Sequence, residues 1–524
     1  MPYIVLVILT LLKTGLMFAL MGLPVWDAAP YTLRIWSNYA FFALLIWTPL
    51  LFTNRRRWTY IVSLLVDIWF IGIVIYFRSY GDILNRWCLD NIGNMDGIWD
   101  SIVPFMHWWD GVFIVLTIIW ILLSELWLKN TTPLSWKRVL ATLCLLILSA
   151  LPQTLVSWRT DIPVNPFSDY YADVSMGRVW YIHCYGPIAQ LCNEAINLTC
   201  HREAAAKSVS DEEIAPYRQA YEESSAEQGN ILLVFFESLE DWTIGLSGDG
   251  VEVTPNINRL ITHSHTAHYA ISAQVKEGKS SDAQLMVFNG LMPIHNGAAA
   301  MRYATNTYPS WVKYAKAEVK QLYAAYPWYM WNQRTNAESY GFDNIYAEDV
   351  SDGSLADSVI NAIRRSHSPF IITAITMASH TPFIRYADGA QWKITSTEYS
   401  DTQKRYLQCV HYTDSAIGDI INSIIDDELL ANNTRIVIMG DHPIFSLDTP
   451  VPLIIYDPFV APVTATRPLY QIDIYTTIIE RLHIATPWHG LGHNIADSCT
   501  YTPTEIKTIE SLSDRIIRTN YFSK

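Results

Sequence analysis

Polar residues that suit metal binding come directly after short apolar runs in the second half of the chain. Glu237 follows one such run, and Asp441 and His442 follow another after a single glycine. His380 comes two residues after a third run. Carboxylates and imidazoles are suitable ligands for a divalent cation, and a carboxylate-rich set favours manganese, magnesium or zinc over copper. Each residue alone would be interpreted as an ordinary loop residue, but together they predict a metal centre.

A hydroxyl nucleophile, Ser280, lies in the segment EGKSSDAQ, residues 277–284. The glycine and hydroxyls of this segment, at a predicted helix start, provide backbone N–H donors that favour an anion. Serine needs activation by a base or a metal, and the predicted metal could bind Ser280 as a further ligand while polarising a phosphoryl oxygen. Lys279 is expected to contact the substrate. The segment is not a P-loop, because Ala273 occupies the position of that motif's first glycine.

The elements that position these residues alternate between short apolar runs and helical patterns. Four continuous runs, typical of parallel strands buried on both faces, lie at 231–236, 370–378, 435–439 and 451–456. Within 403–424 apolar residues recur at helical spacing. This alternation predicts an α/β domain over 229–524 with a mostly parallel, doubly wound sheet. Ligands of such sheets bind beyond the carboxyl ends of the strands, where these polar residues lie.

The first 156 residues are predominantly apolar and predict a membrane domain. Five stretches approach the roughly 20 residues that a hydrocarbon core requires, near 4–21, 35–52, 59–77, 112–128 and 139–156. Lys13 interrupts the first stretch and no clear cleavage site follows it, which favours an anchor over a signal peptide. We therefore expect a five-helix transmembrane domain over 1–156 and a juxtamembrane linker over 157–228.

Basic residues set the predicted orientation. They cluster between the second and third spans and between the fourth and fifth, as Arg55, Arg56 and Arg57, and as Lys129, Lys137 and Arg138. Because cytoplasmic loops retain such residues, we expect the N-terminus inside the cytoplasmic membrane and the domain after the fifth span outside it. The net charge is −14, and the acidic excess lies after residue 156. This charge argues against a nucleic-acid partner.

The ordered motifs FFES, GKSSD, WNQRT, SHTPF, GDH and VPLII resemble the lipoteichoic acid synthase family of the alkaline phosphatase/sulfatase superfamily. The predicted spans and outer domain also resemble the plan of that family. The resemblance implies that one divalent metal, manganese first with zinc or magnesium as alternatives, is bound by Glu237, Ser280, Asp441 and His442. It further implies that the substrate is contacted by His380, Trp331 and Arg334. The family usually has threonine at the nucleophile position and WNR in place of WNQR.

The resemblance also implies a reaction. A metal-dependent transferase would move a phosphoglycerol-type headgroup from a membrane phospholipid to a glycan or lipid alcohol, through a covalent intermediate on Ser280. Three alternatives stay open: a phosphodiesterase or sulfatase-like hydrolase, a phosphoethanolamine transferase of the same superfamily, and an inactive membrane protein that binds a glycan or lipid. A formylglycine sulfatase is disfavoured, because the chain has no C/S-x-P-x-R motif.

Overall fold

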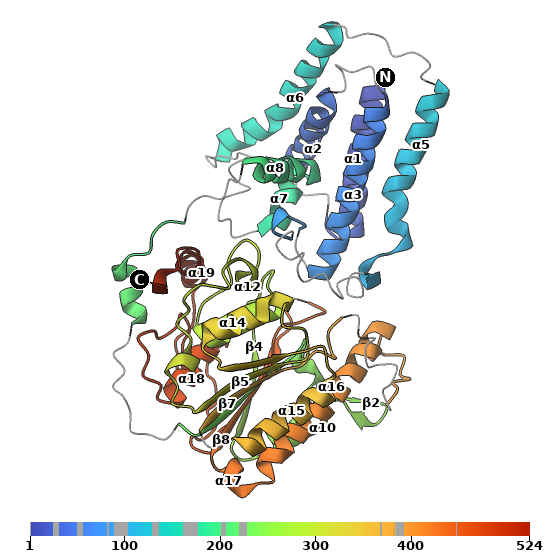
Figure 1. Cartoon of the computed structure of the whole chain (residues 1–524). Coiled ribbons are helices and arrows are strands. Elements are labelled where there is room, and N and C mark those ends of the chain that lie inside the picture. The colour runs from blue at the N-terminus through green and yellow to red at the C-terminus, as the bar shows by residue number, and fades with distance from the viewer. Residues whose placement is uncertain are drawn as a thin grey trace. The chain divides into compact units, whose positions relative to one another are not determined.

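The computed structural model describes residues 2–24, 31–49, 56–80, 83–88, 103–127, 136–160, 177–200, 206–218, 228–366, 369–381, 383, 392–446 and 448–523. The chain folds into two compact units, drawn in Figure 1. One unit contains residues 1–88 and 102–204, and the other contains Ala205–Lys524.

The N-terminal unit is a bundle of mostly apolar helices, α1 (Pro2–Leu20), α2 (Tyr31–Trp47), α3 (Arg56–Tyr80), α5 (Val112–Trp127) and α6 (Trp136–Thr160). Two shorter helices, α7 (Gly177–Tyr185) and α8 (Pro187–Cys200), belong to the same unit. Their Ile182, Tyr185 and Ile188 are buried in one cluster with Phe18 of α1 and Phe70 of α3. Part of the segment expected to be a linker therefore packs into the bundle.

Three helices of the described chain are long and apolar enough to cross a membrane, Tyr3–Leu20, Arg57–Arg78 and Trp108–Glu125. They coincide with the first, third and fourth predicted spans. The second predicted span corresponds to α2, a helix of 17 residues, and the fifth to the short apolar stretch Val139–Leu155 within α6. The structure thus supports three of the five spans. Arg55 and Lys129, used to predict the orientation, lie outside the described residues.

A buried ion pair joins three helices of this bundle. The Lys13 ammonium of α1 contacts the carboxylate of Asp67 on α3 and donates a hydrogen bond to the Thr117 hydroxyl of α5. Lys13 and Asp67 are 3% and 0% exposed. Charged residues inside a membrane helix are costly unless they are paired, so the pair fixes which faces of the three helices meet.

Removing one partner of this pair is expected to destabilise the bundle, because the other charge is left buried and unpaired. Lys13→Met should lower its stability by about 3–5 kcal/mol. The double variant Lys13→Met/Asp67→Leu should recover most of that loss, and thermal unfolding of the full chain in detergent measures both effects. A double variant no more stable than Lys13→Met would contradict the coupling.

The C-terminal unit is built on a sheet that, over the described residues, has seven strands in the order β4-β9-β8-β1-β7-β5-β6. The strands are β1 (Asn230–Phe236), β4 (Thr266–Ile271), β5 (Val319–Ala324), β6 (Asn344–Ala347), β7 (Phe370–Ile375), β8 (Thr434–Gly440) and β9 (Val451–Tyr456). Strands β8, β1, β7, β5 and β6 are parallel, which confirms the predicted mostly parallel sheet.

Strand β9 corrects one part of the prediction. The run 451–456 was expected to be parallel, but β9 is antiparallel to both of its neighbours, β8 and β4. The reason lies in the connection, because only residues 441–450 separate β8 from β9. Antiparallel neighbours can be joined by a short turn, whereas parallel neighbours need a crossover of about a dozen residues or more.

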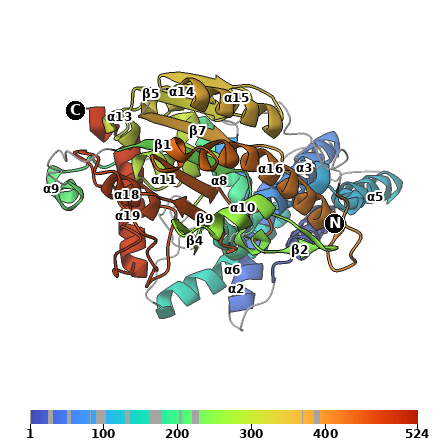
Figure 2. The same cartoon turned by 90° about the horizontal axis from the view of Figure 1, so that it is seen from below.

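Helices cover both faces of this sheet, as Figures 1 and 2 show. Helices α10 (Pro255–Ile261), α15 (Asp352–Arg365) and α16 (Asp401–Ile425) share a core with Leu232 and Val234 of β1. Helices α11 (Ser280–Asn289), α18 (Asp473–Arg481) and α19 (Pro503–Arg518) share the other core with Ile231 and Leu233. Because successive β1 residues point to opposite faces, the sheet is buried on both sides, as a doubly wound fold requires.

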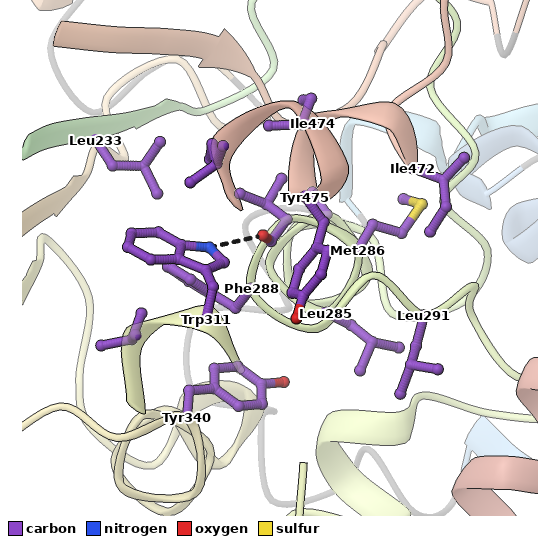
Figure 3. Packing of buried hydrophobic residues seen from close by; sticks show 14 of the residues in the cluster. Leu233, Leu285, Met286, Phe288, Leu291, Trp311, Tyr340, Ile472, Ile474 and Tyr475 are labelled. Atoms are coloured by element: carbon purple, nitrogen blue, oxygen red, sulfur yellow. Dashed lines mark hydrogen bonds between the residues drawn. The ribbon is translucent and has the colours of Figure 1, made fainter. Parts of the chain in front are cut away.

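Helix α11 is buried along its whole length. Phe288 lies in the same core as Tyr475 of α18, and the Trp311 indole N–H donates to the Val287 carbonyl oxygen at 3.0 Å (Figure 3). This apolar anchorage holds the helix in place along its length. Its first residue, Ser280, is therefore held in a defined position.

Candidate metal centre and nucleophile

Three predicted metal ligands lie side by side at the carboxyl ends of β1 and β8. The two strands are parallel neighbours with Phe236 opposite Gly440, so the residues that follow, Glu237 and Asp441, meet at one edge. His442 Nε2 lies 3.4 Å from Glu237 Oε1 and 4.0 Å from Asp441 Oδ2. Ligand atoms of the three residues all lie within 4.8 Å of one another, and the side chains are buried.

The predicted nucleophile belongs to the same cluster. The Ser280 hydroxyl donates a 3.1 Å hydrogen bond to Glu237 Oε2, and the Ser238 hydroxyl donates to Glu237 Oε1 at 2.7 Å. Ser280 is buried, at 7% exposure. Side chains from three separate segments of the chain thus converge on one point.

One carboxylate oxygen at this point accepts no hydrogen bond in the described part of the chain. Asp441 Oδ1 accepts the backbone N–H groups of Ser238 and His442 at 2.7 and 2.8 Å. Asp441 Oδ2 is buried and has no hydrogen-bond partner. A buried carboxylate oxygen calls for a hydrogen bond or a cation. Together with the second carboxylate, the imidazole and the hydroxyl, it forms a donor set that fits a divalent metal ion.

The charges of this cluster perturb one another strongly. Burial and the nearby Glu237 carboxylate raise the pKa of Asp441. Burial alone would lower the pKa of His442, but the Asp441 and Glu237 carboxylates outweigh it and raise that pKa. Burial alone would raise the pKa of Glu237, but the charge of His442 outweighs it and lowers that pKa. Two buried carboxylates thus lie beside a single positive charge, that of His442. A bound cation would supply further positive charge there.

The backbone around His442 explains the glycine of the GDH motif. A Cβ on Gly440 would lie 2.1 Å from the Leu239 carbonyl oxygen, so no other residue fits there. The His442 ring is held through Nδ1, which lies 3.1 Å from the Pro443 carbonyl oxygen. This contact leaves Nε2 facing the carboxylates, and metal-ligating histidines are commonly oriented in this way.

Glu240, which the sequence did not single out, anchors the turn after His442. Its Oε1 accepts the backbone N–H groups of Ile444 and Phe445 at 2.8 and 2.9 Å, and its Oε2 accepts the Trp242 indole N–H. Glu240 is completely buried. Three donors thus satisfy its carboxylate, which ties the turn to the end of β1.

The loop before Ser280 is shaped by Asp282. Its Oδ2 accepts the backbone N–H groups of Lys276 and Gly278 at 2.8 and 3.0 Å, and burial raises the pKa of Asp282 to about 6. A Cβ on Gly278 would lie 2.2 Å from Asp282 Oδ1, which accounts for the glycine. Lys279 adopts a left-handed φ of 45° directly before the nucleophile. Its role toward the substrate stays a prediction.

His380 follows β7 in a loop that a second buried carboxylate organises. Asp352, at the start of α15, accepts the backbone N–H groups of Met377 and Ala378 at 2.9 and 3.1 Å. The next residue, Ser379, donates its hydroxyl to the Glu237 carbonyl oxygen, which joins this loop to the candidate metal centre. His380 Nδ1 lies 2.6 Å from the Thr381 carbonyl oxygen. Nε2 is therefore the ring atom left to address a substrate.

The other predicted substrate contacts lie on a different segment. Trp331 is half-buried in the short helix η7 (Met330–Asn332), and Arg334 lies in the first turn of α14 (Gln333–Tyr340). The Arg334 side chain is 60% exposed and lies 3.7 Å from the Glu338 carboxylate. The structure thus gathers the four predicted metal ligands, with His380 on an adjoining loop. The contacts of Trp331 and Arg334 with a substrate stay predictions.

Two protein-family models match this chain. The model described as sulfatase matches residues 229–484, which include every residue of the candidate centre. The model described as lipoteichoic acid synthase N-terminal domain matches residues 2–161, which include α1, α2, α3, α5 and α6.

Curated relatives of this chain are described as lipoteichoic acid synthases or as similar to them. The lipoteichoic acid synthase-like protein YvgJ of Bacillus subtilis (strain 168) is 24% identical over 422 residues, covering 74% of this chain and 65% of the relative. The lipoteichoic acid synthase of Staphylococcus aureus (strain USA300) is 24% identical over 441 residues, covering 78% and 66%. The match therefore spans slightly less than two thirds of the length of these relatives.

Among solved structures, the lipoteichoic acid synthase LtaP from Listeria monocytogenes is similar with a TM-score of 0.49 and 17% identity. The similarity covers 63% of this chain and 98% of that chain. The family inferred from the sequence motifs is confirmed by the two family models, which match successive parts of one chain. Residues 2–161 therefore match the lipoteichoic acid synthase N-terminal domain and residues 229–484 match the sulfatase domain, so the chain resembles lipoteichoic acid synthases in both of its parts.

Proposed function

We propose that this protein transfers a phosphoglycerol-type headgroup from a membrane phospholipid to an alcohol of a glycan or glycolipid, through a covalent intermediate on Ser280. The observation that carries the proposal is the buried Ser280 hydroxyl, which donates to Glu237 beside Asp441 and His442. The names of the curated relatives support this reaction class, and the three candidate membrane spans suit a lipid donor.

In this proposal Glu237, Asp441, His442 and Ser280 hold one divalent metal ion, manganese first, with zinc or magnesium as alternatives. The ion would neutralise negative charge on the transferring phosphoryl group and favour the deprotonated hydroxyl. His442 offers Nε2, because its Nδ1 faces the Pro443 carbonyl oxygen. Asp441 Oδ2, which accepts no hydrogen bond from the described residues, is a ready ligand atom.

The proposed reaction has two balanced steps. Ser280 Oγ loses its proton and forms a bond to phosphorus, and the bond from phosphorus to the diacylglycerol oxygen breaks, while the headgroup glycerol stays on the phosphorus. That oxygen takes up a proton, which balances the one that Ser280 releases, and diacylglycerol leaves, while His380 is proposed to contact the phosphate. In the second step the acceptor hydroxyl attacks the same phosphorus and gives up its proton, the bond from phosphorus to Ser280 Oγ breaks, and Oγ takes up a proton.

The acidic catalytic domain is proposed to lie outside the cytoplasmic membrane. The basic residues predicted for the inner loops, such as Arg57 and Lys137, support this orientation. A donor phospholipid would then be presented at the outer bilayer surface.

The proposal is tested with the purified full chain, vesicles containing phosphatidylglycerol labelled in its headgroup, and manganese. We expect diacylglycerol to be released and mass spectrometry to find a glycerol phosphate adduct on Ser280. Free glycerol phosphate without any transfer to an added glycolipid would identify a hydrolase instead. Headgroup release that continues with Ser280 unmodified and dispensable would overturn the proposal.

A further inference from the structure

Three buried polar side chains form a closed ring of hydrogen bonds next to the candidate centre. The Tyr326 hydroxyl donates to Gln333 Oε1 at 2.6 Å, Gln333 Nε2 donates to Gln284 Oε1 at 3.1 Å, and Gln284 Nε2 donates to the Tyr326 oxygen at 3.2 Å. All three residues are at most 3% exposed. The ring fixes the relative positions of the three side chains, because breaking any one of its hydrogen bonds would leave buried polar atoms unpaired.

The ring joins the nucleophile helix to the segment that carries Trp331. Gln284 lies on α11, four residues after Ser280 and hence on the same helix face. Gln333 is the first residue of α14 and follows the turn Trp331–Asn332 directly. Tyr326 comes just after β5 and closes the ring between the two helices.

The ring lies close to the charges of the centre. Burial raises the pKa of Tyr326, the hydrogen bond with Gln284 lowers it in part, and the Glu237 and Asp441 carboxylates raise it further. Gln284 links that phenol to the helix of Ser280, and Gln333 links it to the turn. A displacement of Gln333 would therefore move the turn relative to the nucleophile.

The turn itself has an unusual backbone. Trp331 and Asn332 both have left-handed φ values, 52° and 48°. Successive left-handed residues other than glycine are strained, and such strain persists only where the surroundings determine it. The Asn336 amide supplies one restraint, donating to the Trp331 and Asn332 carbonyl oxygens at 2.8 and 3.1 Å. The Asn332 side-chain amide donates to the Ala300 carbonyl oxygen at 3.1 Å, and Gln333, held in the ring, supplies a further restraint.

We propose that Gln284, Tyr326 and Gln333 are positioning residues that hold the Trp331–Asn332 turn at a fixed place relative to Ser280. The turn can then seat the glycerol phosphate part of the donor against the nucleophile. This role rests on the proposed function, because it assumes that the turn contacts the headgroup of the donor lipid. The three residues do not touch the reacting atoms themselves.

The test measures binding of sn-glycerol 1-phosphate to the manganese-loaded full chain by isothermal titration calorimetry. Gln333→Leu removes two sides of the ring and is expected to weaken binding at least 10-fold while manganese binding stays within 2-fold of wild type. The matched control is Gln408→Leu, which removes another buried glutamine, one that donates to the Trp392 carbonyl oxygen. This control should lose thermal stability but bind glycerol phosphate within 2-fold of wild type.

A triple variant separates positioning from stability. Gln284→Leu, Tyr326→Phe and Gln333→Leu together leave no ring member unpaired, so thermal stability should recover towards that of wild type while binding stays weak. The inference would be overturned if the triple variant bound glycerol phosphate as tightly as wild type. It would also be overturned if wild type and Gln333→Leu bound glycerol phosphate equally well, or if neither protein bound it. Binding that depends on Gln333 without release of diacylglycerol from phosphatidylglycerol would retain the ring and reject only the proposed transfer.

Discussion

Ser280→Ala is expected to lower the rate of diacylglycerol release from phosphatidylglycerol by at least about 10⁴-fold, because loss of a covalent nucleophile removes the attacking atom itself. The variant should also show no headgroup adduct. Its fold should be retained, since α11 is anchored by apolar packing and Ser280 contributes one hydrogen bond, to Glu237. Assays of radiolabelled lipid turnover and intact-protein mass spectrometry measure the two effects.

Two variants make this result interpretable. Ser281→Ala removes the neighbouring hydroxyl, which donates to the Gly278 carbonyl oxygen at 2.7 Å, and should reduce the rate by less than about 10-fold, since the net worth of such a bond is only about 1 kcal/mol. Ser280→Thr keeps a hydroxyl at the attacking position and should retain measurable turnover. If Ser280→Ala lost no more activity than Ser281→Ala, Ser280 would not be the nucleophile.

Asp441→Asn is expected to abolish the stabilisation that manganese gives to the protein. At a free metal concentration about 100 times Kd, binding should stabilise the wild type by about 2.7 kcal/mol. The variant should lose this increment, because the amide nitrogen in place of Oδ2 is a poor metal ligand. In the presence of a chelator it should be at least as stable as wild type, because one of two crowded carboxylates becomes neutral. Thermal unfolding of the full chain with chelator or manganese measures both.

The matched control is another buried aspartate. Asp414 accepts the backbone N–H groups of Asn256 and Ile257 at the contact between α10 and α16. Asp414→Asn should lower Tm with chelator and with manganese alike, and should keep the manganese increment. A manganese-induced rise in Tm of wild-type size in Asp441→Asn would show that the ion binds elsewhere.

The convergence of Glu237, Asp441 and His442 could be predicted from sequence because parallel pairing leaves little freedom. Once 231–236 and 435–439 are interpreted as neighbouring parallel strands, Glu237 and Asp441 must emerge at one edge. Ser280 could be predicted because a glycine and hydroxyls at a helix start form a recognisable local pattern. The direction of β9 needed one further consideration, the length of its connection to β8.

The supporting carboxylates could not be predicted in this way. Glu240 accepts N–H groups of Ile444 and Phe445, more than 200 residues further along the chain, and Asp352 accepts that of Met377 from another element. Backbone donors leave no side-chain pattern in the sequence, so nothing marks the partner. Gln333 is similarly unmarked within the sequence WNQR, whereas its side chain is buried in the hydrogen-bond ring.

The Lys13–Asp67 pair has a consequence for the biogenesis of the protein. Its two residues are 54 positions apart in the chain, so α1 leaves the ribosome and reaches the insertion machinery well before α3. A lysine at the centre of a lone helix disfavours integration by about 2.5–3.5 kcal/mol. Helix α1 should therefore partition into lipid poorly by itself and complete its insertion only when the aspartate arrives, which makes the first three helices a single unit of membrane integration.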